Sequence, residues 1–152
     1  MIKRDSKLYL YNSDIEKFTS KIIHDMVAED YKPEIIVAPA RGGLVVGTML
    51  SHYFNVPFYG INKPLQGFYE HPLEKYKKTL VVDDINDRGK TFSYIEVIYS
   101  KFFPENQRRY AAIVENLSSS FDGVDYYGTE INKAEEDLWV VFPWEDWFSR
   151  SL

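Results

Sequence analysis

Three acidic residues and a Gly-Lys-Thr turn lie together in one short segment of the chain. An apolar run precedes them, and the segment reads Leu80, Val81, Val82, Asp83, Asp84, Ile85, Asn86, Asp87, Arg88, Gly89, Lys90 and Thr91. A turn that enters a helix presents backbone N–H groups and the positive end of the helix dipole, which together hold phosphate. Gly89 permits close approach, Lys90 adds a positive charge and Thr91 adds a hydroxyl donor. The segment therefore predicts a phosphate site.

Two other motifs contain similar residues, and the spacing excludes both. A P-loop needs a glycine five positions before Gly89, where this chain has Asp84. A calcium loop counted from Asp84 would need oxygen ligands at Arg88 and Ile95, which cannot provide them. A simpler interpretation is an acidic turn that caps a helix, because Asp is common at helix starts. Paired acids after a buried strand, followed by a third acid and Gly-Lys-Thr, argue against it.

The apolar periodicity predicts alternating strands and helices. Helices are expected over residues 14–29, beginning with a capping box from Ser13 to Glu16, and over 44–54 and 90–103. Strands are expected over residues 34–39, 56–61, 79–83, 109–114, 124–127 and 138–142. This alternation is typical of an α/β fold with a doubly wound, mainly parallel sheet flanked by helices. Residues 62–77 show no such periodicity and predict a long loop.

The predicted sheet brings two unusual turns to the same edge. In an open α/β sheet, ligands bind beyond the carboxyl ends of the strands. The turn after Asp84 lies there, and so does the turn after Pro39, which contains Arg41, Gly42 and Gly43. We therefore expect the functional site at this edge of the sheet.

Composition narrows the class of protein. The chain has 152 residues, a formal net charge of -5 and no cysteine. This length predicts one domain, over residues 1–152. The acidic balance disfavours nucleic acid as a partner, since such binding usually depends on a basic surface. Neither a signal peptide nor an apolar stretch long enough to span a bilayer is present in the sequence, so we expect a cytoplasmic protein without membrane association.

The segment from Val81 to Thr91 resembles the signature of the type I phosphoribosyltransferases throughout. That signature is an apolar strand, two acids, two variable residues, Asp, one residue, Gly, a variable residue and Thr. The resemblance implies that Asp83 and Asp84 hold the ribose hydroxyls of 5-phosphoribosyl-1-pyrophosphate and that Asp87 faces N7 of a purine. It also implies that the loop holds the 5-phosphate, through Asp87, Arg88, Gly89, Lys90 and Thr91.

The turn at Arg41, Gly42 and Gly43 is similar to the pyrophosphate loop of the same family. There the backbone and an arginine hold the leaving group beside Mg²⁺, to which Asp83 and Asp84 would contribute at most one or two contacts. A guanidinium and unhindered glycine amides can stabilise negative charge as pyrophosphate departs. The alternative is a glycine-rich turn shaped only for tight packing between a strand and a helix.

The C-terminal segment from Asp137 to Glu145 is similar to that of compact xanthine-guanine and archaeal purine phosphoribosyltransferases. The resemblance makes Trp139 the platform on which the base stacks, with backbone groups of Trp139 and Val140 reading the base edge. The alternative is a core tryptophan in a short strand. Trp144 and Trp147 are expected to be packing residues.

One departure from these relatives concerns the residue that recognises the base. They carry a lysine that donates to the purine 6-oxo group, and the nearest equivalent here is Asn116. An amide can donate to a carbonyl or accept from an amino group, so the preference among bases stays open. A second departure is in the loop over residues 62–77, where relatives often have a Ser-Tyr pair and this chain has Gln66, Gly67, Phe68 and Tyr69. We expect this loop to close over the donor as part of a small hood built from loop and terminal segments.

Together these features predict a purine phosphoribosyltransferase. It would use 5-phosphoribosyl-1-pyrophosphate, Mg²⁺ and a purine, with guanine, xanthine or hypoxanthine expected, and Asp87 and Arg41 as catalytic residues. A homodimer or homotetramer is expected from the resemblance and the aromatic content of 16%. Two alternatives remain: a regulator that binds the donor without turnover, and a phosphoribosyltransferase for another base.

Overall fold

The core of the protein is a five-stranded parallel sheet. The computed structural model describes residues 1–62 and 73–150. The strand order is β4-β3-β5-β6-β7, and each neighbouring pair is parallel. The strands are β3 (Ile35–Pro39), β4 (Phe58–Ile61), β5 (Lys78–Asn86), β6 (Gln107–Asn116) and β7 (Tyr126–Ile131). The expected α/β fold with a parallel sheet is confirmed.

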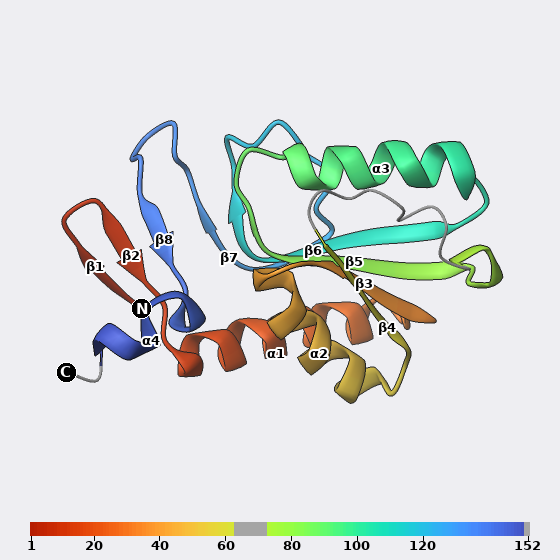
Figure 1. Cartoon of the computed structure of the whole chain (residues 1–152), viewed down its shortest axis with the longest axis horizontal. Coiled ribbons are helices and arrows are strands. Elements are labelled where there is room, and N and C mark those ends of the chain that lie inside the picture. Colours follow the sequence, from red (N-terminus) through yellow and green to blue (C-terminus); the bar gives the residue numbers. More distant parts are fainter. Residues whose placement is uncertain (63–72, 151–152) are drawn as a thin grey trace.

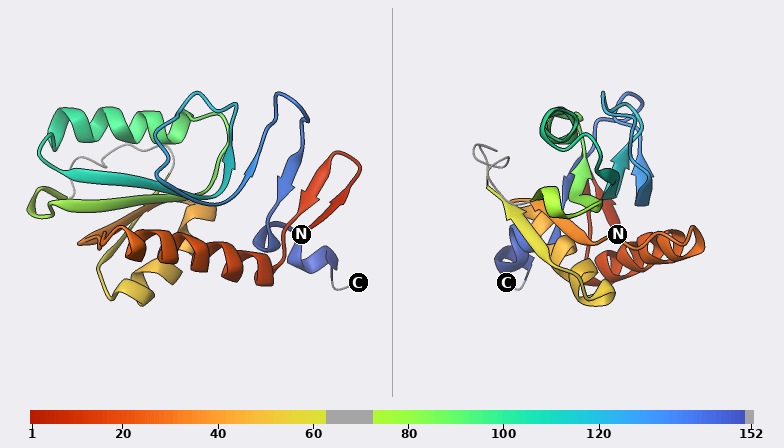
Figure 2. Two further views of the ribbon diagram at one scale, coloured as in Figure 1. Left: turned by 180° about the vertical axis from the view of Figure 1, so that it is seen from behind. Right: turned by 90° about the vertical axis from the view of Figure 1, so that its right-hand side faces the viewer.

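Helices cover both faces of this sheet (Figures 1 and 2). Helices α1 (Asn12–Ala28) and α2 (Gly42–Phe54) lie on one face, and α3 (Lys90–Phe102) lies on the other. Alternation along β3 explains this arrangement, because successive side chains of a strand point to opposite faces. Ile36 and Ala38 join the core cluster beneath α1 and α2, whereas Ile35 and Val37 join the cluster beneath α3.

Helix α1 begins two residues earlier than the sequence predicts. Its first residue is Asn12, and the backbone N–H of Tyr11 donates to Asp14 Oδ2 at 2.9 Å. The predicted capping box at Ser13 was wrong, because Ser13 already lies inside the first turn. The N-terminal ammonium of Met1 also pairs with Asp14 Oδ2, at 2.7 Å. Asp14 thus compensates both the helix N-terminus and the chain terminus.

Strand β5 is longer than predicted, and this changes the position of the acidic pair. The strand continues to Asn86 rather than ending at Asp83, since it keeps its register with β6 as far as the pair Asn86 and Glu115. Asp83 and Asp84 therefore lie within the strand, near its carboxyl end. The turn that enters α3 is limited to residues 87–89, between Asn86 and Lys90.

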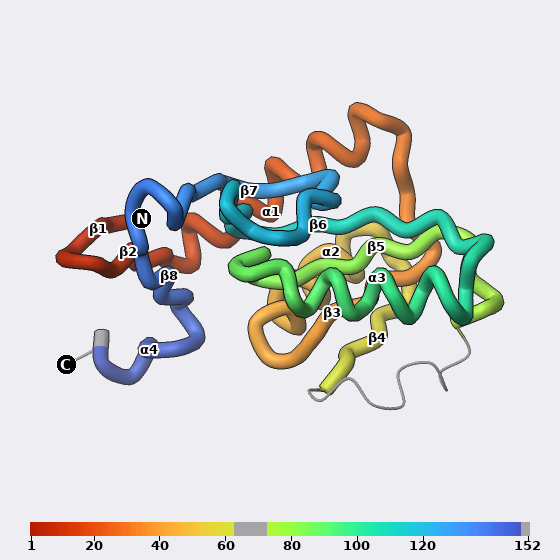
Figure 3. Tube along the Cα trace, turned by 90° about the horizontal axis from the view of Figure 1, so that it is seen from above, coloured from red at the N-terminus to blue at the C-terminus, as the bar shows by residue number. Residues whose placement is uncertain are grey.

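A second, smaller sheet lies beside the first (Figures 1 and 3). Its order is β1-β2-β8, with β1 (Ile2–Arg4), β2 (Lys7–Tyr9) and β8 (Trp139–Val141). The sequence predicts β8 as part of the main sheet, and this was wrong: β8 pairs in parallel with β2 instead. Helix α4 (Pro143–Arg150) follows at the same end of the molecule. The terminal segments therefore form a subdomain next to the main sheet.

The loop predicted over residues 62–77 falls mostly outside the described residues. Its end is described and contains a short 3-10 helix, η2 (Leu73–Lys75), whose Leu73 is fully buried. The expectation that this loop closes over a ligand remains a prediction. In residues 1–62 and 73–150, none of the helices has the length and apolar character needed to cross a membrane.

Truncating Ile22 should test the packing of α1 against the sheet. Ile22 is fully buried, whereas Val27 on the same helix is exposed. We expect Ile22→Ala to lower the free energy of unfolding by about 2–5 kcal/mol through lost burial and a residual cavity. Val27→Ala is the matched control and should change it by less than about 0.5 kcal/mol. Urea unfolding of both variants measures the difference, and equal effects would contradict this packing.

Candidate active site

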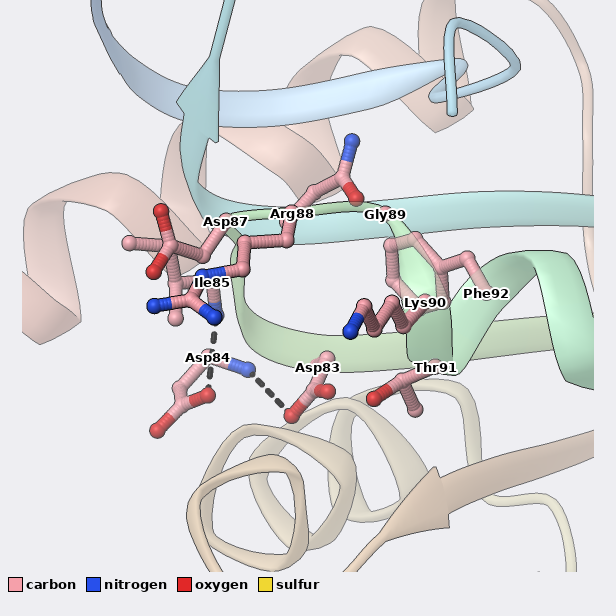
Figure 4. A pocket seen from close by; sticks show the side chains of 10 residues that line it. Asp83, Asp84, Ile85, Asp87, Arg88, Gly89, Lys90, Thr91 and Phe92 are labelled. Atoms are coloured by element: carbon pink, nitrogen blue, oxygen red, sulfur yellow. Dashed lines mark hydrogen bonds between the residues drawn. The ribbon is translucent and has the colours of Figure 1, made fainter. Parts of the chain in front are cut away.

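The side chains of Asp83 and Asp84 each accept a hydrogen bond from the backbone N–H of the next residue. The Asp84 N–H donates to Asp83 Oδ1 and the Ile85 N–H donates to Asp84 Oδ1, both at 2.9 Å. Figure 4 shows these two bonds at the base of the site. Asp83 is buried and Asp84 is partly exposed. Both acids line two adjoining pockets, one towards α3 and one towards α2.

The turn between β5 and α3 encloses the first of these pockets. Its volume is about 250 Å³, and it is lined by the ten residues 83–92. Asp83, Lys90 and Thr91 point towards the same space (Figure 4). Gly89 is the residue before the helix and has φ 79°, in the left-handed region that favours glycine. A side chain there would also lie 2.4 Å from the Phe121 backbone nitrogen, so the turn needs glycine for its shape.

The Arg41 turn packs directly against the acidic pair. A Cβ atom on Gly42 would lie 1.6 Å from Asp84 Oδ2, and one on Gly43 would lie 2.8 Å from the Val82 carbonyl oxygen and 3.1 Å from Asp83 Oδ1. The glycines are therefore required because the two turns touch. The Ala40–Arg41 peptide bond is cis. The predicted meeting of the two motifs is observed.

The larger pocket, of about 780 Å³, lies between the Arg41 turn and the C-terminal subdomain. One wall consists of Arg41, Gly42 and the acidic pair. The opposite wall comes from the C-terminal subdomain and contains Trp144, Glu145 and Phe148. The Phe142 N–H donates to Glu145 Oε2 at 2.9 Å, and the rings of Phe142 and Trp144 stack with centroids 5.0 Å apart. The predicted packing role of Trp144 agrees with this contact.

Trp139 is exposed rather than buried in the core. Its exposed fraction is 61%, so the alternative of a core tryptophan is rejected. Its ring borders two hollows of about 530 and 160 Å³, and Asp87 and Lys133 line both of them. Val140 lines the smaller one, although the Trp139 N–H already donates to the Ser6 carbonyl at 2.8 Å. Trp147 is 67% exposed, so the prediction that it is a packing residue was wrong.

Asn116 lines the larger of these two hollows but uses its amide inside the protein. The side chain is only 4% exposed. Its Nδ2 donates to the Asp87 carbonyl at 2.8 Å, and its Oδ1 accepts from the Lys133 N–H at 3.0 Å and from the Ser118 hydroxyl at 2.9 Å. Asn116 therefore joins the turn of Asp87 to the segment after β7. Its predicted contact with the base stays a prediction.

Lys133 is a charged site residue that sequence analysis missed. Its Nζ lies 2.9 Å from Asp87 Oδ1 and 5.9 Å from the centroid of the Trp139 ring. The predicted strand over 124–127 placed this lysine far from any strand end. The observed β7 runs to Ile131, so Lys133 follows its carboxyl end at the ligand-binding edge. Extending the predicted strand through Thr129 and Ile131 would have provided this signal.

A buried glutamate supports the turn between β5 and α3 from behind. Glu115 on β6 accepts from Asn86 Nδ2 with both carboxylate oxygens at 3.1 Å, and Asn86 Nδ2 also donates to the Phe121 carbonyl at 2.9 Å. Phe121 is the residue whose backbone contacts Gly89. Burial raises the pKa of Glu115 to about 7, because desolvation of the carboxylate outweighs the hydrogen bond from Asn86.

The acidic pair offers carboxylate oxygens that suit Mg²⁺. Across residues 1–62 and 73–150, there is no group of three or more His, Asp or Glu side chains that could hold a metal ion. Two carboxylates beside an anion pocket do match the habit of Mg²⁺, which is bound through one or two carboxylates plus substrate phosphates and water. Asp83 and Asp84 therefore fit Mg²⁺ that arrives with a phosphorylated substrate.

Comparisons with known proteins identify the fold. No protein-family model matches the chain. A segment of 66 residues is 35% identical to the xanthine-guanine phosphoribosyltransferase of Cereibacter sphaeroides, and the match covers 43% of this chain and 34% of that protein. The chain thus spans about a third of the length of this curated relative.

Solved structures match over nearly the whole chain. The xanthine-guanine-hypoxanthine phosphoribosyltransferase of Helicobacter pylori has a TM-score of 0.77 at 22% identity over 94% of both chains. The purine phosphoribosyltransferase of Pyrococcus horikoshii has a TM-score of 0.69 at 23% identity, over 92% of this chain and 95% of that one. The protein has the type I phosphoribosyltransferase fold, and these three similar proteins are named as purine phosphoribosyltransferases.

Replacing Glu115 should change how stability depends on pH. Below pH 4.5 the carboxyl group is protonated in both folded and unfolded chains; as pH rises towards 7, only the unfolded chain loses the proton. Stability is therefore lost over this window, and Glu115→Gln should remove that loss. Relative to the wild type, we expect the variant to gain on the order of 1–3 kcal/mol in unfolding free energy between pH 4.5 and pH 8.

Urea unfolding at several pH values measures this effect. Glu16→Gln is the control, because Glu16 is an exposed glutamate on α1. The unfolding free energy of this variant should depend on pH as that of the wild type does. Parallel pH profiles of Glu115→Gln and the wild type would contradict a raised pKa at Glu115.

Proposed function

We propose that the protein transfers the phosphoribosyl group of 5-phosphoribosyl-1-pyrophosphate to a purine base, with guanine, xanthine or hypoxanthine as acceptors. One observation supports this most: the Arg41 turn packs on Asp84, so an acidic pair lies between two turns suited to anions. The donor has the same order of groups, with a diol between a monophosphate and a pyrophosphate. The exposed ring of Trp139 adds a surface for a planar base nearby.

Each part of the donor has a chemically suitable partner. The backbone N–H groups of the turn, Lys90 and Thr91 would bind the 5-phosphate at the start of α3. Asp83 and Asp84 would accept hydrogen bonds from the ribose hydroxyls. Arg41 and the amides of Gly42 and Gly43 would hold the pyrophosphate in the larger pocket. We assign Arg88, which lines the 5-phosphate pocket, to the same phosphate group.

Magnesium would bind with the donor, through Asp83 or Asp84 together with donor oxygens and water. When bound, it supplies positive charge that offsets the charge of the pyrophosphate. Pairing with the metal also explains why carboxylates are tolerated close to an anionic donor.

The reaction would proceed by substitution at C1 of the ribose. The bond from C1 to pyrophosphate oxygen breaks as the bond from base N9 to C1 forms, through a transition state with oxocarbenium character. Arg41 would stabilise the departing charge, and Asp87 would accept or steer a proton at N7 of the base. Placement of donor and base in adjoining pockets would provide much of the acceleration.

Release of pyrophosphate tests the proposed function. The protein is incubated with the donor, Mg²⁺ and, in turn, guanine, xanthine, hypoxanthine, adenine or uracil. We expect release with at least one oxopurine, and a loss of about 10²-fold or more in kcat for Asp87→Asn. Release with uracil alone would favour another class of acceptor. Tight binding of the donor without release for any base would favour the regulator instead.

Trp139→Ala should weaken base binding specifically. Stacking of a base on an aromatic ring contributes about 1–3 kcal/mol, so the KM for the base should rise about 5- to 150-fold while the KM for the donor changes little. Trp147→Ala is the matched control, because Trp147 is similarly exposed and does not line these hollows. Steady-state kinetics with each substrate varied separately makes the comparison. Equal effects of the two substitutions would rule out Trp139 as the base platform.

We also propose a homodimer or homotetramer in the cytoplasm. Support for self-association comes from α3, which exposes Tyr94, Val97 and Phe102. Apolar side chains of this size on one helix are suited to an interface.

A further inference from the structure

The ammonium group of Lys133 is held inside the pocket where the base is proposed to bind. The side chain is only 16% exposed, and its Nζ pairs with Asp87 Oδ1 at 2.9 Å. It lies 5.9 Å from the centroid of the Trp139 ring and lines both hollows beside that ring. A lysine that served only solubility would extend into solvent. This one is directed towards the place of a ligand.

The backbone of Lys133 is held in place by the same residue that holds Asp87. Asn116 accepts from the Lys133 N–H at 3.0 Å and donates to the Asp87 carbonyl at 2.8 Å. Both ends of the ion pair are therefore attached to one buried amide at the end of β6. The Asn116 amide is therefore engaged within the protein. The ammonium group of Lys133 is charged and faces the hollows, so it is a stronger donor towards a base than the Asn116 amide.

The chemistry of a purine determines what such a lysine can recognise. N7 and the substituent at C6 lie next to each other on one edge of the base; guanine presents two acceptors there, whereas adenine presents an acceptor and an amino donor. A base stacked on Trp139 with N7 towards Asp87 would place its C6 substituent next to Lys133. An ammonium group has three donors and no acceptor, so it can bind a 6-oxo group but not a 6-amino group.

We propose that Lys133 determines the choice of base, by donating a hydrogen bond to the 6-oxo group of a purine stacked on Trp139. The proposal rests on the proposed function and assigns its specificity to the segment between β7 and β8. Asn116 then acts as a positioning residue, which holds Lys133 and Asp87 at the spacing of adjacent groups on one purine edge.

The test compares oxopurine and aminopurine ligands in Lys133→Met. We expect kcat/KM for hypoxanthine to fall about 10- to 100-fold through loss of a charged hydrogen bond, while that for adenine falls much less or rises. Lys133→Gln should narrow the gap further, since its amide can also accept from the 6-amino group. Lys32→Met is the control, because Lys32 is exposed next to the amino end of β3, at the opposite edge of the sheet.

A purely structural role for the ion pair would lower activity with all bases by the same factor, and an unchanged ratio of hypoxanthine to adenine would overturn the proposal. Calorimetric binding of inosine and adenosine monophosphates gives the same ratio without turnover. In one possible outcome, the wild type prefers the inosine nucleotide, Lys133→Met loses that preference, and neither protein converts any base. The proposed catalysis then fails, while the role of Lys133 stands. If the wild type binds neither nucleotide, both fail.

Discussion

The close contact between the Arg41 turn and the acidic pair is the constraint on which the site depends. Gly42 meets the Asp84 carboxylate so closely that no side chain fits between them, and Gly43 is similarly confined by the Val82 carbonyl. This contact is possible because β3 and β5 are neighbours and both end at the same edge of the sheet. It places a guanidinium, two carboxylates and the turn between β5 and α3 around adjoining pockets.

Charge in this acidic protein is arranged locally. The chain has a net charge of -5, yet Arg41, Arg88, Lys90 and Lys133 all line the pockets at the carboxyl edge. Asp87 pairs with one of these cations. Arg41, Arg88 and Lys90 are exposed beside the buried Asp83 and the half-buried Asp84 and Asp87, an arrangement that would favour an anionic ligand locally without a basic surface. The overall charge therefore says little about this ligand.

The residues that sequence analysis located are those that are contiguous in the chain. The acidic pair, the turn from Asp87 to Thr91 and the Arg41 turn are local patterns, and parallel strands bring their ends together. Lys133 and the pairing of β8 with β2 depend on contacts between distant segments, which periodicity does not report. The exposure of Trp139 likewise depends on its place in β8: Trp139 is the exposed first residue of this strand of the small sheet, whereas the next residue, Val140, packs into the core. Hydrophobic pattern alone could not distinguish Trp139 from a core tryptophan.

Phosphorus NMR of one reaction mixture shows whether the protein transfers the phosphoribosyl group. The mixture contains the protein, Mg²⁺, 5-phosphoribosyl-1-pyrophosphate and either guanine or hypoxanthine. The signals of the donor, of pyrophosphate and of the nucleoside monophosphate are followed together. We expect donor signals to be replaced by those of pyrophosphate and nucleoside monophosphate in equal amounts. An unchanged donor with both bases, or pyrophosphate formed without nucleotide, would contradict transfer at this site.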